Sequence, residues 1–207
     1  MTALLTNSGI DVCPGELDPS TVRIDDIAHA LSLRCRLLGH TRIHYSVAQH
    51  SLLVTRILEG MGAPRDAILC GLMHDAHEAY VGNVPTSIKT VLGAAWADVE
   101  RQAEAAVLVA TGLTHAMMDW RDLIRHVDRI ALATERRDLM RFNADSNRSW
   151  PALAGVEPYP HPATEGGWSP RWWEELFLDR FKKLGGVQIH PVHAAMFRPT
   201  RSGVTVL

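Results

Sequence analysis

Cysteines, aromatic residues and long apolar runs are all scarce in this sequence of 207 residues, and two of these shortages exclude a class of protein. The three cysteines, Cys13, Cys35 and Cys70, are odd in number and form no CxxC pair. Their spacing argues against a disulfide framework and against a thiolate zinc site. No stretch reaches the roughly 18 consecutive apolar residues that a membrane span needs. A soluble protein of a reducing cytoplasm is the expectation.

Positive and negative charges are also nearly balanced. Lys and Arg together number 21 and Asp and Glu 23, for a formal net charge of -2, and no basic run is present. Polymeric nucleic acid and anionic membrane surfaces are therefore not expected partners. The first residues, MTALLTNSGIDVCPG, lack the basic start and the apolar stretch of a secretion signal, so we expect no export.

What the sequence does contain is enough apolar residues for one core. With 46% hydrophobic residues, a chain of this length predicts one domain, which we place at residues 23–186. Residues 1–22 are rich in Gly, Pro, Asp and Thr without a sustained period, and predict an irregular arm that precedes the regular structure. Residues 187–207 form a tail for which we make no structural prediction.

Apolar residues recur at helical spacing between recognisable start and stop signals. They predict helices over residues 24–33, 46–60, 64–82, 91–111, 119–142 and 171–184. Residues 143–168 hold four prolines and the pair Gly166-Gly167, and predict a long loop. Because no convincing strand or repeat is present, the expected fold class is all-α, a helical bundle.

Ionisable residues interrupt the apolar faces of three of these helices. His50 lies between Val47 and Val54 on one face, and Asp128 lies between Ile124 and Ala131 on another, with Glu135 on the same stripe. In the helix over 64–82, His74 and Glu78 share a face with small residues, and Asp75 lies at its edge. A buried, unpaired charge costs several kcal/mol, so each of these groups needs a partner.

Two explanations compete for these buried groups. Taken singly, each is a core histidine bonded to a carbonyl or an aspartate paired with an arginine, and Arg125 and Arg129 are close to Asp128 in sequence. Taken together, the two imidazoles and two carboxylates of three helices form the mixed nitrogen and oxygen set that divalent cations prefer. We favour the second explanation, a metal site.

The same residues carry a resemblance to a known family. The ordered set His50, His74-Asp75 and Asp128, with HDAHE and the turn PTSIK, resembles the HD-domain phosphohydrolase superfamily. The segments IAHALSLRCRLLGHTRIHYSVAQHS, HDAHEAYVGNVPTSIK, HVDRIALATERRDL and WSPRWWEELFLDRFKKL are similar to its compact bacterial and phage branch. That branch includes YfbR-like 5'-deoxynucleotidases and DatZ-like dATP triphosphohydrolases. The similar segments cover most of residues 24–184.

The resemblance implies an HD-domain helical bundle with a buried metal site. His50, His74, Asp75 and Asp128 would bind one divalent ion, with Mn, Co, Zn, Ni and Mg all candidates, and additional Mg could accompany a polyphosphate substrate. Glu78 matches the family's catalytic glutamate, which orients water or carries a proton. Its alternative is a solvated helix end.

Four further positions follow from the resemblance. Arg36 falls where relatives place an arginine that contacts the nucleotide, although Arg34 and Arg42 compete for this role, and Lys89 matches a lysine placed for phosphate. His77 is an exposed residue or a second phosphate contact, and Arg36 and Lys89 could equally be surface charges. Asn83 stands in the catalytic turn where relatives commonly carry Asp, and an amide cannot act as a base.

The predicted function is hydrolysis of a (deoxy)nucleotide phosphate ester, of a dNMP or a dNTP, by metal-activated water. A dATP-specific triphosphohydrolase that releases triphosphate is one alternative, and a non-catalytic HD regulatory or scaffold module is another. A cyclic-dinucleotide phosphodiesterase is disfavoured, because its Gly-Tyr-Pro segment is absent. The expected partners are a small-molecule nucleotide and further copies of the chain in a homo-oligomer.

Overall fold

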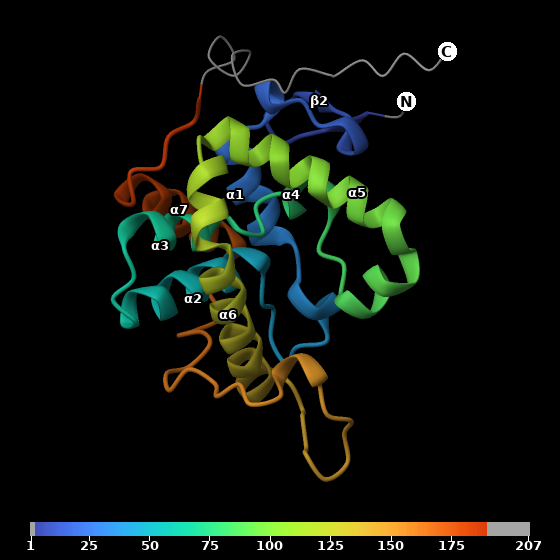
Figure 1. Cartoon of the computed structure of the whole chain (residues 1–207), viewed down its shortest axis with the longest axis vertical. Helices are drawn as coiled ribbons and strands as arrows, with labels where there is room; N and C mark the ends of the chain where they lie inside the picture. Colours follow the sequence, from blue (N-terminus) through green and yellow to red (C-terminus); the bar gives the residue numbers. More distant parts are fainter. Residues whose placement is uncertain (1–2, 190–207) are drawn as a thin grey trace.

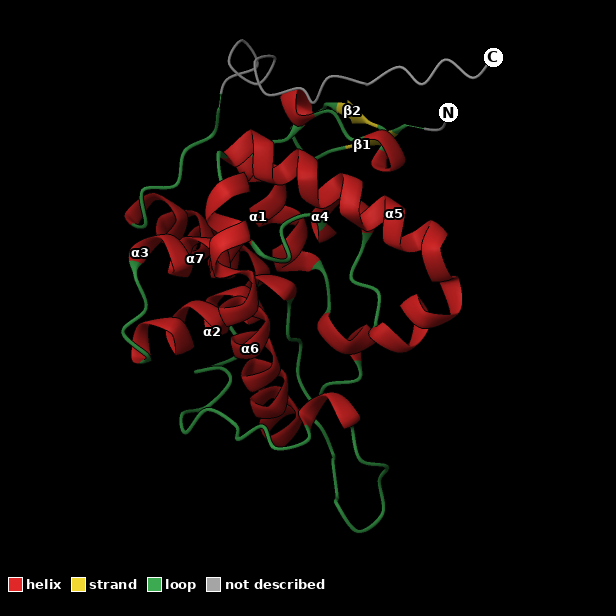
Figure 2. Cartoon of the chain, viewed as in Figure 1, coloured by secondary structure: helices red, strands yellow, loops and turns green. Residues whose placement is uncertain are grey.

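Helices dominate the computed structural model, which describes residues 3–189 (Figures 1 and 2). The expectation of a mostly helical fold is confirmed. The α-helices within the described residues are α1 (Ile24–Leu33), α2 (Val47–Gly60), α3 (Arg65–Met73), α4 (Glu78–Val81), α5 (Thr86–Thr111), α6 (Thr114–Leu139) and α7 (Pro170–Lys183). None of them is both long and apolar enough to cross a membrane.

The N-terminal arm has regular structure, contrary to expectation. Strand β1 (Leu4–Leu5) pairs antiparallel with β2 (Asp11–Val12), and two 3-10 turns follow at Pro14–Glu16 and Pro19–Thr21. The two 3-10 turns contact α5, and the whole segment lies along that helix in Figure 1. Val12, Leu17 and Val22 are buried in the main core. Because these anchors follow no helical or strand period, the sequence pattern gave no sign of them.

Helix α2 is the central element of the bundle. It contacts α1, α3, α6 and α7. Ser46 starts it with a capping box: its hydroxyl accepts a hydrogen bond from the Gln49 amide, and the Gln49 side chain accepts one from the Ser46 amide. This cap fixes where the helix begins and therefore which residues of α2 face inward.

The predicted helix over 64–82 is interrupted at residues 74–77. Helix α3 ends at Met73 and α4 begins at Glu78. Between them the backbone bonds span three residues, from the Ala76 amide to the Met73 carbonyl and from the Glu78 amide to the Asp75 carbonyl. These bonds are of the 3-10 type, so His74 and Glu78 do not lie on one continuous α-helix as predicted.

The two longest helices begin before their predicted first residues, and α6 also ends earlier, at Leu139 instead of residue 142. Helix α5 starts at Thr86 instead of residue 91 and is kinked at Gly93, where φ is 66°. Helix α6 runs down through the molecule in Figure 1 and starts at Thr114 instead of residue 119. The long loop predicted over 143–168 is confirmed, apart from one 3-10 turn at Pro151–Leu153. The predicted C-terminal tail lies mostly outside the described residues.

Candidate metal centre

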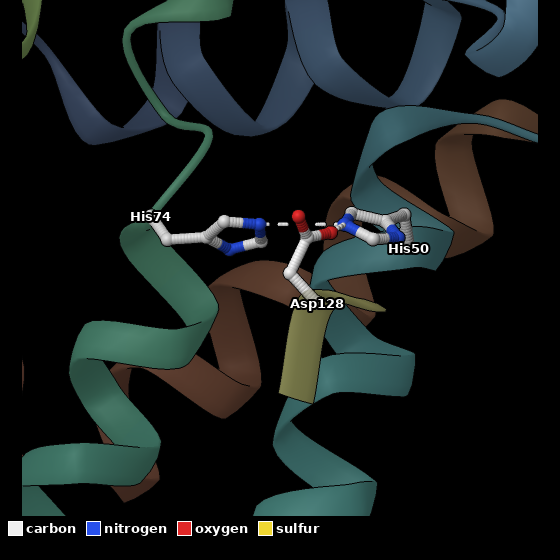
Figure 3. Close-up of side chains that lie close together, drawn as sticks. All are labelled: His50, His74 and Asp128. Carbon is white, nitrogen blue, oxygen red and sulfur yellow. Dashed lines mark hydrogen bonds and ion pairs between the residues drawn. The ribbon is translucent and has the colours of Figure 1, made fainter. Parts of the chain in front are cut away.

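Three helices bring two histidines and one aspartate together. His50 comes from α2, His74 from the C-terminal end of α3 and Asp128 from the middle of α6. Figure 3 shows the Asp128 carboxylate between the two imidazole rings. One candidate ligand atom of each residue lies within 4.8 Å of the others, so this group could hold a metal ion.

Asp75 adds a second carboxylate to this group. Its Oδ2 atom lies 3.2 Å from Nε2 of His74 and 3.6 Å from Nε2 of His50. Nε2 of His50 in turn lies 3.3 Å from Nε2 of His74 and 3.1 Å from Oδ1 of Asp128. The four metal ligands predicted from the sequence are thus brought together.

The partners of the other ring nitrogens fix which atoms face the centre. Nδ1 of His50 lies 2.6 Å from a carboxylate oxygen of Glu135, and Nδ1 of His74 lies 2.8 Å from the carbonyl of Gly71. The carbonyl oxygen of Gly71 can only accept a hydrogen bond. The Glu135 carboxylate also accepts, because Arg36 and His50 hold its pKa below the usual value despite burial. Both Nδ1 atoms therefore carry a proton, so each ring directs a lone pair inward whenever it is neutral.

Four acceptor atoms thus converge with no donor among them, unless an imidazole is protonated. The pKa values of the two imidazoles are raised by this cluster of acceptors. Burial and Arg36 lower the pKa of His50, but Glu135 and Asp128 raise it overall to about 9. For His74, burial is outweighed by Asp75, which raises its pKa. Both shifts indicate that the surroundings of the two imidazoles favour added positive charge.

The net charge around the centre can be balanced by one divalent cation. Asp75, Asp128 and Glu135 all have lowered pKa values despite burial, since His50, His74 and Arg36 favour their ionised forms. These three negative charges face the single positive charge of Arg36. The remaining two can be neutralised by two imidazolium protons or by one divalent ion.

The spacing of the four atoms also suits a small cation. A metal bonded to nitrogen and oxygen at about 2.0–2.2 Å separates neighbouring ligands by about 3 to 3.5 Å. The four separations given above run from 3.1 to 3.6 Å, and the ligand atoms of His50, His74 and Asp128 all lie within 4.8 Å of one another. The donor set and these separations are therefore compatible with a divalent metal ion.

The candidate ligands differ in exposure, although Oδ1 of Asp128 itself is buried. The His50 side chain is fully buried and that of His74 is 10% exposed, whereas Asp128 is 40% exposed. A ligand could therefore approach from the Asp128 side. Arg125, considered above as the partner of Asp128, instead lies 3.9 Å from Asp122.

Glu78 and Asn83 form a second pair near the centre. Asn83 donates a hydrogen bond of 2.8 Å to the Glu78 carboxylate, and the Glu78 residue is only 3% exposed. Burial and the charge of Asp75 raise the pKa of Glu78 to about 8, although Arg36 and the Asn83 hydrogen bond act in the opposite direction. Glu78 is therefore a buried carboxyl that can exchange a proton near neutral pH.

The three residues predicted to contact substrate lie in different surroundings. Arg36 is 12% exposed, with its guanidinium 3.3 Å from Asp75, 3.6 Å from Asp128 and 3.5 Å from Glu135. Lys89 forms an ion pair of 2.7 Å with Glu100. His77 lies on the turn after Asp75, and within residues 3–189 its buried Nδ1 has no hydrogen-bond partner. Only Arg36 contacts the predicted metal ligands.

Two features of the centre and its surroundings could not be predicted from the sequence. The pairing of Glu135 with His50 has no local signal in the sequence, because 85 residues separate the two. The second feature is the backbone after Arg36, where Leu37 and Leu38 have φ values of 53° and 55°. Consecutive non-glycine residues in the left-handed region are uncommon, and no residue pattern signalled them.

Together the fold and the centre define a class: a helical protein with a buried His/Asp group that can hold a metal ion. The chain is 33% identical over 188 residues to "Uncharacterized protein YfdR" of Escherichia coli K12, covering 89% of this chain and 96% of that protein. It is 30% identical over 136 residues to "Uncharacterized protein RCAP_rcc00048" of Rhodobacter capsulatus, covering 63% and 69%. The chain belongs to the family of YfdR. No protein-family model matches it.

Proposed function

We propose that this protein is a metal-dependent phosphohydrolase of the HD-domain type that acts on a deoxynucleotide, either a dNMP or a dNTP. One observation carries the proposal. Acceptor atoms of His50, His74, Asp75 and Asp128 converge from three segments, with Nε2 of His50 3.1–3.6 Å from the other three, and each imidazole is anchored through its other nitrogen. Such an arrangement binds a divalent cation and leaves a side open for substrate.

A divalent cation held by these four residues would polarise a phosphate and lower the pKa of a water molecule. The protein's own residues would supply the remaining functions. Glu78 would accept or return a proton, since its raised pKa allows both states near neutral pH. Asn83 would hold the Glu78 carboxylate in one orientation through its amide hydrogen bond.

Arg36 fits a charge-balancing role more closely than the nucleotide contact predicted from the sequence. Its guanidinium is largely buried and faces three carboxylates. A phosphate bound at the Asp128 side would still be attracted by the positive charge of the Arg36 guanidinium. Lys89 would need to leave Glu100 before it could reach a phosphate.

The proposal is tested with purified protein loaded with Mn, Co or Mg. Release of phosphate and of triphosphate is measured from panels of dNMPs and dNTPs, with His74→Ala and Glu78→Gln beside the wild type. His126→Ala is the matched control, because His126 is an exposed residue of α6 outside the centre. We expect turnover only for the wild type and the control. If the protein binds metal but hydrolyses no nucleotide, the proposed hydrolase activity would be contradicted and a non-catalytic module favoured.

A further inference from the structure

A carboxylate that is not a metal ligand controls the orientation of His50. Glu135 lies on α6, and one of its oxygens accepts a hydrogen bond of 2.6 Å from Nδ1 of His50 on α2. Both side chains are fully buried, so no solvent competes for this bond. The pair joins two helices at the level of the candidate centre.

The second carboxylate oxygen of Glu135 faces Arg36 in an ion pair, without a hydrogen bond to it. This oxygen lies 3.5 Å from Nε of Arg36, whose Nη atoms face Asp75 and Asp128. Burial raises the pKa of Tyr45, and the nearby Glu135 carboxylate raises it further. Glu135 therefore has little freedom to turn away from His50.

This arrangement has a direct effect on what His50 can bind. A carboxylate cannot donate a hydrogen bond, so the proton of the neutral ring stays on Nδ1 and the lone pair stays on Nε2. Nε2 is the atom that faces His74 and Asp128. A negative charge on the far side of the ring also makes Nε2 a stronger ligand.

We infer that Glu135 is the positioning residue of the metal centre: it holds His50 with Nε2 directed at the metal and sets the affinity of the site. A role limited to pairing with Arg36 would not require the short bond to His50. The inference rests on the metal site of the proposed function and is independent of its substrate.

The test is the dissociation constant for Zn or Co, measured by competition with a chelating dye. Glu135→Gln keeps the size of the side chain and an oxygen that can accept from Nδ1, but removes the charge. We expect metal binding weakened by about 10- to 100-fold, the usual effect of losing such a partner. Thr134→Val is the matched control, because Thr134 is also fully buried on α6 and contacts Tyr159 rather than the centre. An affinity within about twofold of wild type in folded Glu135→Gln would overturn the inference.

A second measurement on the wild type decides the matter should Glu135→Gln fail to fold. Nitrogen NMR of the zinc-loaded protein should show His50 bound through Nε2, with a slowly exchanging proton on Nδ1. Coordination of His50 through Nδ1, or absence of zinc binding, would overturn the inference. If Glu135→Gln binds metal more weakly but the wild type hydrolyses no nucleotide, the inference about Glu135 would stand and only the proposed function would be contradicted.

Discussion

Asn83 donates a hydrogen bond of 2.8 Å to the carboxylate of Glu78, five residues earlier in the chain. The sequence places an amide where relatives of the resembled family commonly carry a carboxylate. In this structure the amide opposes the two effects that raise the Glu78 pKa, burial and the charge of Asp75. Asn83 therefore helps Glu78 to ionise, which a second carboxylate in contact with it could not do.

The first prediction concerns the pH dependence of stability in the presence of a chelator. The pKa of Glu78 is raised from 4.5 to about 8, so the folded state holds this proton more strongly than the unfolded state. Its contribution is complete below pH 4.5 and is lost as the pH rises to about 8. We expect Glu78→Gln to be more stable than wild type at pH 9, by on the order of 1–3 kcal/mol.

Chemical denaturation at several pH values measures this difference. At pH 4.5 and below, the two proteins should differ little, because wild-type Glu78 is then protonated when folded. A Glu78→Gln variant whose stability follows the same pH curve as wild type would show that Glu78 is not the responsible group.

A second prediction concerns the close approach of α2 and α3. A Cβ atom on Gly71 would lie 2.3 Å from Cδ1 of Leu58 and 3.2 Å from Cγ1 of Val54. Because Leu58 and Val54 are fully buried, Gly71→Ala should cost about 1–3 kcal/mol of unfolding free energy. It should also weaken metal binding, since the Gly71 carbonyl anchors His74. Thermal denaturation and a metal titration test both effects, and unchanged values in both would contradict the account.

The left-handed backbone after Arg36 gives a third prediction. Leu38 has a φ of 55° and a side chain that is mostly exposed, so its conformation costs about 1–2 kcal/mol that glycine would avoid. Leu38→Gly should therefore stabilise the protein by about 0.5–1 kcal/mol after the entropy of glycine is subtracted. Leu33→Gly is the control, because Leu33 is equally exposed but helical and should be destabilised. Destabilisation of both variants to the same extent would show that the backbone at Leu38 is not strained.

Arg36 provides a fourth prediction. Its guanidinium is the positive group that faces Asp75, Asp128 and Glu135, so Arg36→Gln leaves three buried or half-buried carboxylates without it. In chelator the variant should lose about 3–5 kcal/mol of stability. A divalent ion should restore more stability to the variant than to the wild type, because it neutralises the same carboxylates. Melting curves with and without metal measure this, and an equal metal-induced shift in both proteins would contradict it.

Local patterns predicted the helices and the inward faces well, because caps and periodicity act over a few residues. Ser46 and the apolar spacing of α2 located His50 correctly. The same rules failed at residues 74–77, where the chain tightens into a 3-10 turn, and in the N-terminal arm, where isolated side chains reach the core. The pairing of Glu135 with His50 depends on how α2 crosses α6, which no local pattern encodes. Assembly into a homo-oligomer and the contact of Lys89 with phosphate remain predictions.

The central claim is that His50, His74, Asp75 and Asp128 bind one divalent metal ion. The most direct test is the number of ions bound per chain, determined by titration of chelator-treated protein with Co or Zn and by elemental analysis. We predict one tightly bound ion in the wild type and in His126→Ala, and loss of that ion in His74→Ala and Asp128→Ala. A wild type that binds no ion, or a His74→Ala variant that binds it equally well, would contradict the account.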